Sequence, residues 1–327
     1  MGALVGVAVG DALGMPGQTL TRGEILARYG RISGFVAPFA GHPVSHGLLA
    51  GQVTDDTEQT MLLAERLIAD QGRFNPQEWA RALLDWERRV KARGLRDLLG
   101  PSSKAALAAL LAGVPVTETG LKGTTNGAAM RIVPVGIATP PDERALVARV
   151  EAACQVTHAT GEAIGAASAV AMVVSLGVAG LSFEAALPKA LAAARAGNRW
   201  GAKVGEADMA GRIALALEIA RYGDEPALAA QIGTSVASRE SVAAAFGVVR
   251  LAAGDPWAAA LIAANIGDDT DTIGAIAAGM AGACAGLAAF PATLVAQVRR
   301  ANDFNPGPVV AGLLQLRFGP ATGNAAR

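Results

Sequence analysis

Two short clusters of aspartate and threonine are the residues best suited to chemistry. They are Thr54–Thr57 (TDDT) and Asp268–Thr272 (DDTDT), and each stands just before a strongly apolar segment of helical character. We therefore expect each cluster at a helix N-terminus, where free backbone amides and the helix dipole favour negative charge. Capping explains part of the pattern, because Asp55 with Glu58 predicts a capping box and Asp269 can cap the helix that follows.

Capping leaves most of these carboxylates unexplained. A cap needs one acceptor, whereas the clusters supply two and three aspartates with threonine hydroxyls between them. Packing so many like charges into a turn costs energy unless a cation compensates for it. Hard divalent cations prefer oxygen ligands, and an oxygen-only set without histidine indicates Mg²⁺ or Mn²⁺ rather than zinc. The sequence thus predicts a metal site, with plain helix caps as the alternative.

Helices must position these clusters, because apolar residues recur at spacings of three and four along most of the chain. Strand patterns are weak, and only the segments 31–36 and 132–135 look briefly extended. We predict one all-α domain over residues 1–318 and a disordered tail over 319–327, since no linker or fixed-period repeat is visible. The predicted helices are Thr57–Asp70, Gln77–Arg93, Ser102–Ala112, Asp142–Val156, Gly161–Val178, Phe183–Ala196, Glu206–Arg221, Arg239–Ala253, Pro256–Ala264, Thr270–Ala289 and Ala292–Ala301.

Composition limits the partners of this chain. It has 327 residues, is 52% apolar and carries a formal net charge of zero. Nucleic-acid binding needs a basic excess or a basic face, so we expect no nucleic-acid partner. The uncharged stretches Ala163–Leu181 and Ile273–Val298 reach the length of a membrane span, but both are rich in small residues and follow polar motifs. We expect them to be buried core helices, and we expect no membrane partner.

Cysteine usage and the N-terminus indicate a cytoplasmic location. Cys154 and Cys284 lie in apolar helical stretches without CxxC spacing, which predicts neither a disulfide nor a zinc site. The apolar start of the chain lacks the basic region of a secretory signal. The sequence leaves the oligomeric state open between monomer and dimer.

Five motifs together resemble the ADP-ribosylglycohydrolase family, which includes dinitrogenase-reductase-activating glycohydrolases and ADP-ribosyl-arginine and ADP-ribosyl-serine hydrolases. The resemblance covers roughly residues 2–290, and the motifs stand in the order seen in that family. They are GDALG (10–14), TDDT (54–57), TNGAAMRIVPVG (125–136), THAT (157–160) and GDDTDTIGAIAAG (267–279).

The resemblance implies a compact, all-α orthogonal helical bundle with two Mg²⁺ or Mn²⁺ ions at the base of a cleft. Asp268 corresponds to a glycine in many relatives and is left out of the metal site. Asp55, Asp56 and Asp271 are the residues we expect to carry the reaction. The implied metal ligands are Thr54, Asp55, Asp56, Asp269, Asp271 and Thr272.

The resemblance also implies substrate-binding residues. The segment Asn126–Met130 (Asn126, Gly127, Ala128, Ala129, Met130) resembles the loop that approaches the ribose and diphosphate of the substrate. Glycine there allows close backbone approach, and amides at a helix start suit phosphate. The alternative is a plain helix start after a turn. His158 resembles a substrate-contacting histidine, whereas an isolated histidine in an alanine-rich helix is more often a hydrogen-bonded core residue.

One departure from the family concerns the acid/base group. Many relatives carry a metal-linked glutamate four residues after GDALG, where this chain has Gln18. Glutamine can coordinate or orient a water, but it cannot shuttle a proton. Asp55, Asp56 and Glu58 are the nearest carboxylates in sequence. The long non-helical segment 31–53, with His42 and His46, is either a functional loop or a polar connection.

Three functions fit these observations. The first is metal-dependent hydrolysis of the glycosidic bond at the anomeric carbon of an ADP-ribosyl group, on a protein or a small molecule. The second is an N-ribosidase for a smaller ribosyl compound, a nucleoside or nucleotide, which Gln18 and the His42–His46 loop favour. The third is a catalytically silent ribosyl-ligand-binding or structural protein. Intact aspartates in both clusters count against the third.

Overall fold

The structure is a computed structural model that describes residues 1–95, 99–204 and 208–319. Within these ranges the regular structure is helical, with three isolated β-bridges and no sheet, as the sequence predicts. The α-helices are α1 Gly2–Gly14, α2 Arg22–Tyr29, α3 Asp55–Ala69, α4 Pro76–Ala92, α5 Pro101–Leu111, α6 Gly127–Met130, α7 Val133–Ala138, α8 Glu143–Cys154, α9 Gly161–Val178, α10 Phe183–Asn198, α11 Met209–Tyr222, α12 Glu225–Ile232, α13 Ser238–Leu251, α14 Pro256–Ala264, α15 Thr270–Ala285, α16 Ala292–Asn302 and α17 Gly307–Phe318. Two 3-10 helices, η1 Met15–Gly17 and η2 Leu287–Ala289, follow α1 and α15.

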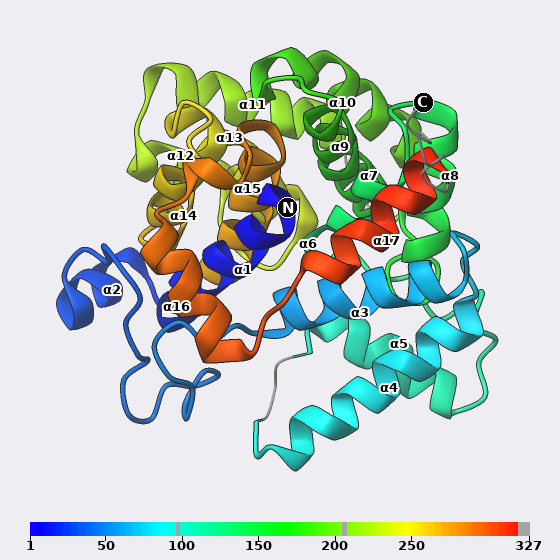
Figure 1. The fold of residues 1–327 in the computed structure, drawn as a ribbon, viewed down its shortest axis with the longest axis horizontal. Helices are drawn as coiled ribbons and strands as arrows, with labels where there is room; N and C mark the ends of the chain where they lie inside the picture. The colour runs from blue at the N-terminus through cyan, green and yellow to red at the C-terminus, as the bar shows by residue number, and fades with distance from the viewer. Residues whose placement is uncertain (96–98, 205–207, 320–327) are drawn as a thin grey trace, which may run out of the picture.

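Helices α1 and α15 lie together at the centre, α3–α5 lie on one side of them, and α10–α13 lie on the other (Figure 1). One hydrophobic core connects residues from Ala3 to Leu313. Helix α9 is the one described helix long and apolar enough to cross a membrane, and 94% of it is buried inside the molecule. Helix α15 is buried along most of its length, so both uncharged stretches contribute core helices, as expected.

A stripe of glycines brings α1 and α15 into unusually close contact. Glycine stands at every fourth position of α1, and an added Cβ at each would lie 2.0–2.3 Å from a backbone oxygen of α15. Gly2 faces Gly282 and Gly10 faces Gly274, so the helices are antiparallel. Because only glycine permits this approach, the C-terminal end of α1 reaches the N-terminal end of α15. This is where one of the two acidic clusters lies.

Most of the predicted helices are present, with changed ends. Residues 132–135, expected to be briefly extended, belong to the start of α7, because Pro134 occupies the first turn, where a missing N–H costs nothing. Residues 31–36 form no strand. The predicted helix Thr270–Ala289 ends at Ala285, since Gly286 takes a positive φ of 83°. Residues 205–207 and 320–327, at the predicted start of one helix and in the predicted tail, lie outside the described residues.

The close contact of α1 with α15 generates a stability prediction. Gly10→Ala forces a methyl group against the backbone of Gly274, so we expect a loss of about 1–3 kcal/mol in the free energy of unfolding. Urea denaturation followed by circular dichroism measures this loss. The matched control is Gly23→Ala in α2, where an added Cβ meets nothing within 4 Å, and stability should stay equal or rise. Equal stability of the Gly10→Ala variant and the wild type would contradict the prediction.

Candidate active site

Both acidic clusters begin helices, and the two N-termini lie next to each other. Asp55 opens α3 and Thr270 opens α15. Thr272 Oγ1 donates to Asp56 Oδ2 at 3.4 Å across the two helices. A cavity of about 250 Å³ opens beside them, and its wall includes Asp55, Asp269 and Asp271. The structure therefore brings together two sequence segments that are more than two hundred residues apart.

Asp11 of the GDALG motif holds the start of α3 in place. Its carboxylate accepts the backbone N–H groups of Thr54 at 3.0 Å and Thr57 at 3.1 Å, and also both threonine hydroxyls. Asp11 thus caps α3 from another helix. Sequence reasoning missed this role, although a single carboxylate inside the otherwise apolar segment 2–14 was a visible signal.

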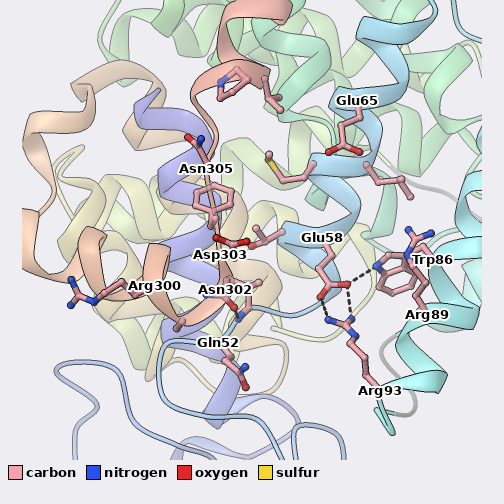
Figure 2. Close-up of a pocket in the computed structure, with 18 of the residues that line it drawn as sticks. Gln52, Glu58, Glu65, Trp86, Arg89, Arg93, Arg300, Asn302, Asp303 and Asn305 are labelled. Atoms are coloured by element: carbon pink, nitrogen blue, oxygen red, sulfur yellow. Dashed lines mark hydrogen bonds and ion pairs between the residues drawn. The ribbon is translucent and has the colours of Figure 1, made fainter.

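This cap replaces the predicted capping box, which is wrong. Thr54 is the N-cap residue of α3 and makes no side-chain cap bond. Glu58 points away from the aspartates, where Trp86 Nε1 donates to its Oε2 at 2.7 Å and Arg93 pairs with its Oε1 at 2.8 Å (Figure 2). These contacts border a second cavity of about 1100 Å³, which Glu58 lines and none of the clustered aspartates does. Glu58 is therefore no proton carrier for the cleft.

The second cluster also differs from the capping prediction. Asp269 is the N-cap residue of α15, but its side chain caps nothing. Instead, Asn126 Nδ2 donates to Asp269 Oδ2 and, at 2.8 Å, to Ser241 Oγ. Asp268, which the sequence left out of the site, has an exposed side chain and a positive φ of 62°. Its backbone forms a bridge to Leu20 and so ties the start of α15 to the segment after α1.

Gln18 lines the cavity, and its amide orientation follows from its neighbours. Ser45 Oγ donates to the carbonyl oxygen of Met15 at 3.1 Å, so it must accept from Gln18 Nε2. The carbonyl oxygen Oε1 is then the atom that Gln18 offers to the cleft. Ser45 and Val44 belong to the segment 31–53, and Val44 also lines the cavity, so this segment is part of the site. The His42 ring organises it by accepting the N–H of Ser45 at 2.9 Å.

Three residues of the predicted substrate segment line the cavity, namely Asn126, Gly127 and Met130, while Ala128 and Ala129 are buried and do not line it. His158 is fully buried one layer behind the wall, where its Nε2 lies 3.0 Å from Thr125 Oγ1. An added Cβ at Gly127 would lie 2.9 Å from the His158 ring. His158 therefore packs against the substrate segment and is not among the residues that line the cavity.

Burial and mutual repulsion raise the pKa values of the clustered carboxylates. Burial raises the pKa of Asp11 to about 6, against the opposing effect of hydrogen bonds from Thr57 and Thr54. Burial likewise raises the pKa of Asp269 to about 6, opposed by the bond from Asn126. Burial, followed by the charges of neighbouring aspartates, raises the pKa values well above the usual range for three more residues, Asp55, Asp56 and Asp271.

The oxygen atoms of the clusters are suitable ligands for a hard divalent cation, although the carboxylates alone do not form a complete coordination site. Asp56 Oδ1 and Asp271 Oδ1 are buried without a hydrogen-bond partner, which is costly unless a cation coordinates them. Within residues 1–95, 99–204 and 208–319, no three His, Cys, Asp or Glu side chains converge as a ready-made site. Hydroxyl and water oxygens would have to complete the coordination. Thr54 and Thr272 supply such hydroxyls beside Asp56.

Comparison with known proteins shows relatives that match most of this chain. A solved structure described as an ADP-ribosylglycohydrolase-related protein complex superimposes with a TM-score of 0.68 and 27% identity, covering 96% of this chain and 95% of that one. YegU of Escherichia coli K12, itself uncharacterized, is 35% identical over 93% of both chains. ADP-ribosylarginine hydrolase Tri1 of Pseudomonas putida is 26% identical over 91% of this chain and 73% of that protein. The fold and these matches define a glycosyl hydrolase.

The chain belongs to the ADP-ribosylglycohydrolase family, whose model matches residues 1–320. A further relative, the ADP-ribosyl-[dinitrogen reductase] glycohydrolase of Rhodospirillum rubrum, is 30% identical over about half of each chain, 48% of this one and 50% of that one. The family resemblance read from the five sequence motifs is thereby confirmed.

The raised pKa values predict how stability depends on pH in chelator-treated protein. A carboxyl whose pKa rises on folding, from 3.8 to about 6 for Asp11 and Asp269, favours the folded state when protonated. That contribution is lost as pH rises through the folded pKa, so the Tm should fall between pH 5 and pH 7.5. Differential scanning calorimetry measures the change.

Asp271→Asn provides the control for this pH dependence. It removes one buried like charge, so it should raise the Tm of the chelated protein at pH 7.5 and flatten the pH dependence. A Tm that stays constant or rises from pH 5 to pH 7.5 in the chelated wild type would overturn the electrostatic explanation.

Proposed function

We propose that this protein is a divalent-metal-dependent hydrolase that cleaves the glycosidic bond at the anomeric carbon of an ADP-ribosyl group. The observation that carries this proposal is the pairing of two acidic helix N-termini beside one cavity, with buried carboxylate oxygens that lack partners. Members of the family are generally metal-dependent. Relatives named for hydrolysis of ADP-ribosyl linkages support the substrate class.

The residues that would hold two Mg²⁺ or Mn²⁺ ions are the six implied by the family resemblance: Thr54, Asp55, Asp56, Asp269, Asp271 and Thr272. Bound ions would supply Lewis-acid stabilisation of ribose oxygens and a water of lowered pKa. Asp55, Asp269 and Asp271 face the cavity, and their negative charge would stabilise the positive charge that develops at the anomeric carbon. Asp56 does not line the cavity and is only 1% exposed, so it would act from behind the residues that do.

Gln18 would orient the attacking water or a ribose hydroxyl through Oε1, the atom its amide offers to the cleft. A neutral amide holds this geometry without moving a proton. The proton for the leaving group must therefore come from a group other than Gln18. An aglycone that is a good leaving group without protonation would suit such a cleft.

One observation favours the smaller substrate as a second candidate. The cavity of about 250 Å³ lies below the ~300–1,000 Å³ usual for sites that enclose drug-sized ligands. It has room for a ribosyl unit, while the rest of an ADP-ribosyl group would extend over the rim. The substrate of an N-ribosidase with the same centre, a nucleoside or nucleotide, is smaller than an ADP-ribosyl compound and would leave less of itself outside this cavity.

A hydrolysis panel tests both candidates. Protein with Mg²⁺ or Mn²⁺, and with chelator as control, is incubated with ADP-ribosyl-arginine, ADP-ribosyl-serine, nucleosides and nucleotides, and products are separated by chromatography. We expect metal-dependent release of ADP-ribose, and a fall in kcat of about 100-fold or more for Asp271→Asn.

Asp268→Asn is the matched control for this panel, because its side chain is exposed in the same segment and asparagine tolerates a positive φ. Its activity should equal that of the wild type. Release of ribose or ribose phosphate from nucleosides or nucleotides, without turnover of ADP-ribosyl compounds, would replace the first candidate by the second. Full activity in chelator would exclude the metal-dependent proposal.

A further inference from the structure

Arg131 is a buried cation that the proposed chemistry does not use. It follows α6, is 1% exposed, and its guanidinium lies over the ring of Trp79 with Cζ 5.6 Å from the centroid. In the described part of the chain, no carboxylate lies within salt-bridge distance of it. Its hydrogen-bond partners in this part are neutral side chains, Gln59, Thr157 and His158. Burying an arginine that pairs only with neutral groups costs free energy of folding. The position of Arg131 therefore calls for an explanation.

The first branch from Arg131 leads to the acidic cluster. Arg131 Nη1 donates to Gln59 Oε1 at 2.6 Å, and Gln59 Nε2 donates to Asp55 Oδ2 at 3.2 Å. Because a guanidinium can only donate, it determines which end of the Gln59 amide faces Asp55. Asp55 therefore always receives an N–H from this side. One oxygen of the Asp55 carboxylate, Oδ2, accepts this hydrogen bond, which leaves Oδ1 for another partner.

The second branch leads to Thr125, another residue that lines the same cavity. Arg131 Nη2 donates to Thr157 Oγ1 at 2.6 Å and lies 3.4 Å from His158 Nδ1, while Thr157 Oγ1 lies 2.7 Å from the same nitrogen. Because the guanidinium can only donate, Nδ1 accepts, the Thr157 hydroxyl can donate to the same nitrogen, and we assign the proton of the neutral ring to Nε2. Burial, and then the charge of Arg131, hold the pKa of His158 well below its usual range, which keeps the ring neutral.

This tautomer decides the role of the Thr125 hydroxyl. His158 Nε2–H donates to Thr125 Oγ1 at 3.0 Å, so the hydroxyl hydrogen of Thr125 must point elsewhere. No acceptor for it is present among the described residues, and Thr125 lines the cavity. The backbone of Thr125 is held by a bridge to Ala237 and by Ser238 Oγ, which donates to its carbonyl oxygen at 2.8 Å. Thr125 thus presents a well-positioned O–H donor to the cleft.

We propose that Arg131 is a positioning residue that directs hydrogen-bond donors to two parts of the cavity lining, Asp55 and Thr125. Through Gln59 it orients Asp55, and through Thr157 and His158 it makes Thr125 a donor to a ribose or phosphate oxygen of the ligand. His158 acts on the substrate only through Thr125. The ligand half of this inference rests on the proposed function, whereas the arrangement of protons within the network does not.

The first experiment examines the network without any ligand. The chain has three histidines, so long-range ¹H–¹⁵N NMR spectra of labelled protein, with His158→Gln for assignment, report the protonation of the His158 ring directly. We expect the neutral Nε2–H form at pH 7 in the wild type. Thr157→Val and Arg131→Lys should shift the Nδ1 resonance or mix the tautomers. An Nδ1–H tautomer or an imidazolium in the wild type would overturn the proposal.

The second experiment measures ADP-ribose binding by calorimetry in the presence of Mg²⁺. Thr125→Val keeps the shape of the side chain and removes the donor, so we expect an affinity about 10-fold weaker, with Thr125→Ser restoring it. Thr124→Val is the matched control, because it makes the same change at the neighbouring residue, which does not line the cavity. Gln59→Leu should lower kcat on any hydrolysed substrate more than it weakens ADP-ribose binding.

The outcomes separate this inference from the proposed function. If the wild type binds ADP-ribose and Thr125→Val binds it equally well, the donor role of Thr125 is wrong while the function stands. If the wild type binds no ADP-ribose, the proposed function and the ligand half of the inference both fall. The tautomer of His158 then still decides whether Arg131 organises the network. Should Arg131→Lys fail to fold, Thr157→Val tests the same branch.

Discussion

The contact between α1 and α15 is the constraint on which the site depends. Four glycines of α1 allow its backbone to touch that of α15 over the length of both helices. This contact brings Asp11 close to the second acidic cluster and places Gln18 at the cavity wall. Asp11 in turn caps α3 and so sets the position of the first cluster. The cleft is therefore organised from one buried pair of helices outward.

The charges around the cleft are arranged in layers. The innermost layer is a group of buried aspartates whose pKa values are raised by burial and then by their mutual repulsion. Around it lie neutral donors, namely Asn126, Gln59 and threonine hydroxyls, which hold individual carboxylate oxygens. Arg131 lies one layer further out, where Gln59 bridges it to Asp55 and the charges of Asp55 and Asp56 still act on it. Because Gln59 lies between them, the guanidinium of Arg131 does not occupy the position beside the carboxylates that a metal ion would take.

The sequence was sufficient for the fold class and for identifying the two acidic clusters that the structure brings together. Helical periodicity predicts α3, α9 and most of α15, because each buries a broad apolar face. It misses α1, since glycine lowers helix propensity and the compensating contact is made by a distant segment. The side-chain partners of Asp11 and Glu58 were equally unpredictable. Each bonds to residues 28–46 positions away, and spacing along one helix says nothing of such pairings.

The separation of α1 from its partner helix also has a consequence for synthesis of the chain. Gly14 accepts a hydrogen bond from Thr270, 256 residues later. At a translation rate of about 5–20 residues per second, α1 waits roughly 10–50 s for α15 to emerge. During this time an apolar helix that is buried on every side in the finished fold lacks its main partner, although α3 and α7, which also pack against it, are already made. Newly made chains thus pass through a period in which α1 depends on chaperones or on non-native contacts for cover.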